Sequence, residues 1–128
     1  MNNLTIKISG TGLTKITDHW SKSLIDLSVE SAKQALSESN IIPDMIIFAN
    51  TLSSYSSSQE NLSTIISEKL GLSNIDSFKI ESSSCSGAMA VNVAHKLLSS
   101  NDIESVLVIG SEKLSKCPDA TKTLRESI

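Results

Sequence analysis

The chain has 128 residues, of which 39% are hydrophobic and only 3% aromatic, and its formal net charge is −3. This is the size of one compact domain with a mainly aliphatic core, and the small charge excludes the basic surface that binds nucleic acid or an anionic membrane. Neither a signal-peptide pattern nor a run of roughly 18 apolar residues is present, so we expect a cytoplasmic protein without a membrane contact.

The first half of the chain alternates between strand and helix patterns. Residues 5–9 alternate around two isoleucines before a Gly-Thr-Gly turn, which indicates a first strand. Apolar residues at helical spacing then run from Ser23, a candidate N-cap, to Asn40. The continuous apolar run at 45–49 predicts a strand that is buried on both faces.

The second half continues the alternation. A second amphipathic helix is predicted from about residue 58 to Gly71, followed by a third strand at 77–80. Apolar residues surround the segment 85–99 almost completely, which predicts a buried third helix. A fourth strand is expected at 105–110, and residues 113–128 read as a polar loop or tail.

This order of elements favours a single α/β domain over residues 1–128. Strand and helix alternate as βαβαβαβ, which predicts three layers around a mainly parallel sheet with right-handed crossovers. The two cysteines, Cys85 and Cys117, lie far apart without a CxxC pair, so no zinc site and no disulfide framework is indicated. A free thiol with its own chemistry becomes a candidate.

The join between the third strand and the third helix is the candidate site. Ligands of an open parallel sheet bind beyond the carboxyl ends of its strands, where the following helices begin. There Cys85 would feel the positive end of the helix dipole, which favours a thiolate, and the small Ser86 and Gly87 would let a substrate approach the backbone. This pattern is typical of a nucleophile turn for acyl transfer, although a free cysteine is more often a small buried residue.

Five blocks, in order along nearly the whole chain, resemble the N-terminal part of thiolases of the archaeal and sterol-carrier type. They are residues 8–15, 23–27, 49–53 with 58–62 and 69–72, 79–90 (KIESSSCSGAMA) and 108–115. The resemblance implies a thiolase superfamily member, similar to acetyl-CoA acetyltransferases, with a nucleophile in the fourth block. The three-layer fold expected from the pattern agrees with this family.

The resemblance leaves two positions for the nucleophile. Such thiolases usually read Cys-x-Ser-Gly, and an ungapped match places Ser84 where their cysteine stands. The related hydroxymethylglutaryl-CoA synthases and type III ketoacyl synthases often read Cys-x-Gly, which fits Cys85-Ser86-Gly87. We prefer Cys85, because a thiolate is a far better nucleophile than an unassisted hydroxyl, and keep Ser84 as the alternative. Ser86, Gly87 and, more weakly, Asn50 are the candidate substrate contacts, although an Asn after a strand is more often a turn residue.

The resemblance also implies partners. The family's catalytic histidine and second cysteine lie in a later half, and His19 and His95 are expected to be packing or surface residues. We therefore predict a subunit of a split acyltransferase whose substrate is a coenzyme A thioester, which it condenses or cleaves through a cysteine acyl-enzyme. It would bind no cofactor or metal itself. A longer thiolase-like chain would complete the site in a hetero-oligomer, and a zinc-ribbon and OB-fold protein is a further candidate partner.

Two other interpretations stay open. The chain could be a non-catalytic subunit with a thiolase fold, which stabilises or regulates a longer thiolase-like partner. The shift between Ser84 and Cys85 is the feature that favours this interpretation. It could also be a fragment of a longer gene product.

Overall fold

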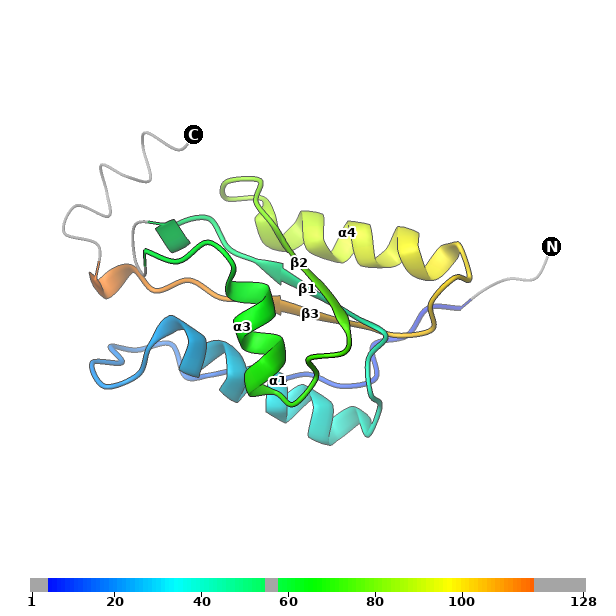
Figure 1. The fold of residues 1–128 in the computed structure, drawn as a ribbon, viewed down its shortest axis with the longest axis horizontal. Helices are drawn as coiled ribbons and strands as arrows, with labels where there is room; N and C mark the ends of the chain where they lie inside the picture. The colour runs from blue at the N-terminus through cyan, green and yellow to red at the C-terminus, as the bar shows by residue number, and fades with distance from the viewer. Residues whose placement is uncertain (1–4, 55–57, 117–128) are drawn as a thin grey trace.

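The computed structural model describes residues 5–54 and 58–116 of the chain. Three strands form one parallel sheet in the order β2-β1-β3. Helix α4 covers one face of this sheet, and α1 and α3 cover the other, which confirms the three-layer α/β prediction (Figure 1). The elements are α1 (Leu24–Ser39), β1 (Met45–Ala49), α3 (Leu62–Lys69), β2 (Asp76–Ile80), α4 (Ser86–Ser99), β3 (Val106–Gly110) and the 3₁₀ turn η1 (Leu114–Lys116).

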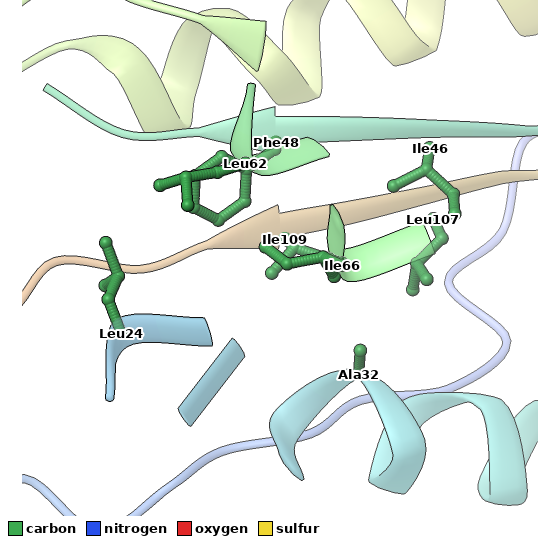
Figure 2. Packing of buried hydrophobic residues seen from close by; sticks show 8 residues of the cluster. All are labelled: Leu24, Ala32, Ile46, Phe48, Leu62, Ile66, Leu107 and Ile109. Carbon is green, nitrogen blue, oxygen red and sulfur yellow. The ribbon is translucent and has the colours of Figure 1, made fainter. Parts of the chain in front are cut away.

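The central strand β1 carries the core. Ile46, Ile47 and Phe48 are fully buried, as the continuous apolar run predicts. Because side chains alternate along a strand, Ile46 and Phe48 face α1 and α3 whereas Ile47 faces α4. On the first face, Phe48 packs beside Leu62 of α3, and the remaining aliphatic side chains from α1, α3 and β3 complete the cluster (Figure 2).

The predicted first strand is wrong: residues 5–9 do not belong to the sheet. The segment instead runs beside α1, and its two glycines allow this close approach (Figure 1). A Cβ on Gly10 would lie 2.2 Å from the Ala35 carbonyl oxygen, and one on Gly12 would lie 1.9 Å from that of Ser31. A strand needs a neighbour for its backbone hydrogen bonds, and a groove separates residues 5–9 from the nearest edge, that of β3.

Helix α1 begins and ends where the sequence predicts. Ser23 and Asp26 form a capping box: the Ser23 hydroxyl accepts a hydrogen bond from the Asp26 N–H at 3.0 Å, and the Asp26 carboxylate accepts one from the Ser23 N–H at 2.9 Å. The Ser23 hydroxyl also donates to the Asp26 carboxylate at 2.7 Å, and this bond, followed by the one from the Ser23 N–H, holds the pKa of Asp26 below its ordinary value. At the other end Asn40 takes the left-handed conformation, with φ 53°, that closes many helices.

Helix α3 begins later than predicted, at Leu62 after an N-cap at Asn61, and Gly71 follows it with φ +76°. Helix α4 starts as predicted but is buried along one face only, formed by Ser86, Ala90 and Ala94. The expectation of burial all round therefore fails, because no described element packs on its outer face, where Val91 is 60% exposed.

An acidic residue fixes the amino ends of β1 and β3 to each other. The Asp44 carboxylate accepts hydrogen bonds from the backbone N–H groups of Glu104 and Ser105, each at 2.9 Å. The Asp44 N–H in turn donates to the Ser105 carbonyl at 3.0 Å. The bonds to the carboxylate, led by that from the Glu104 N–H, lower the pKa of Asp44.

The chain after β3 is more structured than the predicted polar tail. Lys113 is buried, and its ammonium donates to the backbone carbonyls of His19 and Lys22 in the segment before α1. The short turn η1 follows, and the rest of the predicted tail, 117–128, lies outside the described residues. None of the helices in the described ranges combines the length and apolar character needed to cross a bilayer.

Candidate functional site

A tight serine-rich turn connects β2 to α4. Ser83 adopts a left-handed conformation with φ +51°, which turns the chain sharply at this point. The buried Ser86 hydroxyl accepts a hydrogen bond from the Ser82 N–H at 2.8 Å and donates one to the Ser83 carbonyl at 2.7 Å. From the end of β1, the Thr51 hydroxyl also donates to the Ser83 carbonyl, at 2.9 Å. The turn is therefore held from both sides.

Cys85 occupies the N-cap position of α4, with its thiol exposed. Its backbone N–H donates to the Ser82 carbonyl at 3.0 Å, and its carbonyl accepts from the Met89 N–H at 2.9 Å. Within the described ranges, no hydrogen bond is recorded for the thiol or for the backbone N–H groups of Gly87 and Ala88. A nucleophile placed here lies at the positive end of a fourteen-residue helix, with free donors next to it.

Ser84 and Cys85 have different surroundings. Ser84 helps to line a cavity of about 360 Å³ beyond the carboxyl ends of the strands, together with Asn50, Gly87 and Glu112, whereas Cys85 is not among its lining residues. Residues three and four apart share a helix face, so Cys85 lies in line with Ala88 and Met89 on the uncovered side of α4. The two candidate nucleophile positions thus open onto different spaces.

Asn50 fixes the carboxyl ends of β1 and β3 to each other. Its side chain is 2% exposed, and its amide N–H₂ donates to the Ser111 carbonyl at 2.8 Å and to the Glu112 carboxylate at 2.9 Å. The other oxygen of that carboxylate accepts from the backbone N–H groups of Thr51 at 3.0 Å and Leu52 at 3.3 Å. Asn50 Oδ1 is buried without a partner in the described residues.

The structure places the predicted site residues as follows. Ser84, Ser86, Gly87 and Asn50 all line the strand-end cavity, but the hydroxyl of Ser86 and the amide of Asn50 are used in hydrogen bonds within the protein. Their contact with a substrate stays a prediction. Glu112 was not predicted to help build this site, although paired strand ends place the residues after Ala49 and Gly110 side by side.

Neither histidine is placed to act on Cys85. His95 is exposed and lies ten residues further along α4, which helical rise converts into about 15 Å. His19 lies in the segment before α1, where its Nε2 is 2.6 Å from the Lys15 carbonyl oxygen. Among the described residues, no group of three or more His, Cys, Asp or Glu side chains could hold a metal ion. Cys117 lies outside them.

These features define a class of protein: a parallel α/β domain that presents a cysteine where a helix begins beyond the strand ends. The particular family follows from sequence comparison. The pattern of the family described as "Thiolase, N-terminal domain" matches residues 6–128, and the chain belongs to this family. The predicted membership of the thiolase superfamily is confirmed.

Known relatives include both thiolases and ketoacyl synthases. The acetyl-CoA acetyltransferase of Methanocaldococcus jannaschii is 31% identical over 123 residues, which are 93% of this chain and 31% of that protein. The β-ketoacyl-[acyl-carrier-protein] synthase III of Sulfurimonas denitrificans is 37% identical over 100 residues, 75% of this chain and 30% of that one. The crystal structure of 3-oxoacyl-[acyl-carrier-protein] synthase III from Aquifex aeolicus superposes with a TM-score of 0.70 at 27% identity, covering 83% of this chain and 35% of that chain.

The comparisons confirm the family and the fold, and they show how much of the relatives' length the chain spans. It spans about a third of the length of the curated relatives that it matches. Among those relatives are β-ketoacyl-[acyl-carrier-protein] synthases III.

Proposed function

We propose that this chain is the nucleophile-bearing part of a thiolase-like acyltransferase, with Cys85 as the residue that accepts the acyl group. The observation that carries the proposal is the exposed thiol of Cys85 at the N-cap of α4, in a chain of the thiolase N-terminal family. Relatives named for acetyl and ketoacyl transfer support the chemistry.

In the proposed reaction the Cys85 thiolate attacks the thioester carbonyl of an acyl-CoA. A bond forms between Cys85 Sγ and the acyl carbon, the bond from that carbon to the coenzyme A sulfur breaks, and coenzyme A leaves as a thiol after taking up a proton. The free N–H groups of Gly87 and Ala88 lie at the end of α4 where negative charge on an acyl oxygen would be stabilised. The acyl group would then be condensed with a second acyl-CoA, or the reverse cleavage would run.

A further polypeptide would complete this site. The proton taken from the Cys85 thiol needs a base, and neither His19 nor His95 is placed to serve, so we propose that a longer thiolase-like chain provides a histidine and a second cysteine. The side of α4 that continues from Cys85 supports this, because the apolar side chain of Met89, one turn further along, is 36% exposed. A longer partner chain that reaches Cys85 would also cover Met89. A zinc-ribbon and OB-fold protein would be a third member of the hetero-oligomer.

A non-catalytic role is the second candidate. The observation that favours it is that Ser84, and not Cys85, lines the strand-end cavity. In that case the chain would bind a longer thiolase-like protein through the side of α4 that carries Cys85 and Met89 and would stabilise or regulate it, without forming an acyl-enzyme.

The test is intact-mass spectrometry of the chain, together with whatever polypeptide co-purifies, after brief incubation with acetyl-CoA. Peptide mapping should locate an acetyl adduct on Cys85 that disappears in Cys85→Ala and persists in Ser84→Ala, the matched control one residue away. An adduct that persists in Cys85→Ala and disappears in Ser84→Ala would assign the nucleophile to Ser84. No adduct at either position, with the partner present, would establish the non-catalytic role.

A further inference from the structure

The backbone carbonyl of Ser83 is the point on which the turn before α4 is held. It accepts hydrogen bonds from the Ser86 N–H at 3.1 Å, from the Ser86 hydroxyl at 2.7 Å and from the Thr51 hydroxyl at 2.9 Å. The hydroxyl oxygens of Thr51 and Ser86 also lie 3.1 Å apart. Ser86 belongs to the turn itself, whereas Thr51 follows β1 and stands 32 residues before Ser83 in the chain.

The conformation of Ser83 depends on such contacts. A serine rarely takes the left-handed conformation, with φ +51°, that Ser83 adopts here. A return of Ser83 to an ordinary conformation would turn its carbonyl away from Thr51 and would swing the following residues, Ser84 and Cys85, to a new place. The Thr51 hydroxyl opposes this rotation, so it acts on the orientation of Cys85 through Ser83.

Thr51 is itself fixed to the paired ends of β1 and β3. Its backbone N–H donates to the Glu112 carboxylate at 3.0 Å, and the buried Asn50 amide donates to the same carboxylate at 2.9 Å. Asn50 also donates to the Ser111 carbonyl at 2.8 Å. The Thr51 hydroxyl therefore has a defined position relative to the sheet, and it transmits that position to the turn.

We infer that Thr51 is a positioning residue for acyl transfer: its hydroxyl, acting through Ser83, aligns the Cys85 thiol with the free N–H groups at the start of α4. The inference rests on the function proposed for Cys85. When the sulfur attacks an acyl carbon, negative charge gathers on the carbonyl oxygen, and these N–H groups must face that oxygen at the same moment. Alkylation of the same thiol by iodoacetamide expels iodide from a saturated carbon and places no charge on an oxygen. Loss of alignment should therefore slow acylation and spare alkylation.

The experiment compares these two reactions at Cys85 in the full chain. p-Nitrophenyl acetate acylates the thiol and releases p-nitrophenolate, iodoacetamide alkylates it, and peptide mapping measures each rate at Cys85. Thr51→Val keeps the shape of the side chain and removes the hydroxyl, whereas Thr51→Ser keeps the hydroxyl. Thr64→Val is the matched control, because the Thr64 hydroxyl bonds within α3 and its cap, to the Asn61 side chain at 2.9 Å.

Thr51→Val should lower the ratio of the acylation rate to the alkylation rate by about tenfold, part of the roughly 10²–10³ that one oxyanion donor contributes. Thr51→Ser and Thr64→Val should keep this ratio within about twofold of the parent chain. A Thr51→Val chain with a lower urea midpoint and an unchanged ratio would show a merely structural contact and would overturn the inference. An equal drop in both rates would overturn it too, as would a Thr51→Ser chain with the same loss as Thr51→Val.

A second variant covers the case in which Thr51→Val does not fold. Ser86→Ala removes the other hydroxyl from the Ser83 carbonyl and should lower the ratio in the same way, and an unchanged ratio in this variant would overturn the inference. The two proposals fail separately, because p-nitrophenyl acetate acylates an exposed thiol whether or not the chain recognises coenzyme A. Failure of acetyl-CoA to label Cys85 counts against the proposed function, whereas an unchanged ratio counts against the role of Thr51.

Discussion

The hydrogen bonds of Asn50 predict an unusual order of stability among its variants. Replacement of Asn50 by alanine removes one bond to a neutral carbonyl and one to a carboxylate, worth about 1 and about 2 kcal/mol. The same replacement also removes the buried Oδ1 that has no partner, which returns about 1–3 kcal/mol. The Asn50→Ala variant should therefore lose only about 1 kcal/mol.

The Asn50→Asp variant should be much less stable, although it keeps the shape of the side chain. Its carboxylate oxygen would replace the N–H₂ group that now faces the Ser111 carbonyl and the Glu112 carboxylate, so a buried charge would meet two acceptors. Such an unpaired buried charge costs about 3–5 kcal/mol.

Urea denaturation at pH 7, with an unchanged slope as the control for two-state unfolding, measures both variants. Lowering the pH should reduce the difference in free energy of unfolding between the Asn50→Ala and Asn50→Asp variants. Burial and the neighbouring Glu112 raise the pKa of the introduced carboxyl in the folded state, so its penalty is present at neutral pH and is removed once it is protonated. If Asn50→Asp equals or exceeds Asn50→Ala in stability at pH 7, the assigned direction of the Asn50 amide is wrong.

Three further outcomes are expected. Gly12→Ala should lower the free energy of unfolding, measured in urea, by about 1–3 kcal/mol, because its Cβ would overlap the α1 backbone. Gly110→Ala is the control and should change this free energy far less, because its Cβ has open space around it. Equal effects of the two substitutions would refute the tight contact at Gly12. Gly87→Ala should leave the unfolding midpoint nearly unchanged, because its Cβ also meets nothing, yet should slow acylation of Cys85 in the mass-spectrometric assay if the acyl group approaches there. The urea midpoint should stay constant between pH 7 and about 5 and fall as the pH drops below about 4. Hydrogen bonds lower the pKa of the Asp26, Glu38 and Asp44 carboxyls in the folded state, so their contribution to stability is lost when they are protonated. A midpoint that stays constant down to about pH 2 would contradict this.

Local patterns predicted the fold wherever a segment determines its own structure. The capping residue Ser23, the apolar run at 45–49 and Gly71 each fix a feature through the chemistry of neighbouring residues, and all three appear as expected. The prediction of a strand at residues 5–9 failed because a strand needs a neighbouring strand to pair with, and the alternation of apolar and polar residues does not show whether one is present. The prediction that α4 is buried on all sides failed for the same reason, since an apolar pattern shows which side chains a helix can bury and not which elements cover them.

The turn that carries the candidate site was predicted in position, but its internal contacts were not. The rule that ligands lie beyond parallel strand ends located the turn before α4, and the resemblance assigned the thiol there. The sequence could not show that Ser86 would be used inside the turn, because that depends on the left-handed Ser83 and on Thr51 from another strand. Glu112 was missed because its partner Asn50 lies 62 residues earlier, a distance that no local pattern spans.

Two carboxylates, one at each end of the β1–β3 pair, fix the register of these strands. Asp44 holds the two strands at one end and Glu112 at the other, so neither strand can slide by one residue, a slip that would exchange the side chains of the two core faces. The division of side chains between the face that packs on α1 and α3 and the face that packs on α4 is thereby set at both ends of the strand pair. The same two contacts place the carboxyl ends of β1 and β3 level with each other, so the backbone beneath the strand-end cavity is positioned by residues outside the cavity's hydrophobic support.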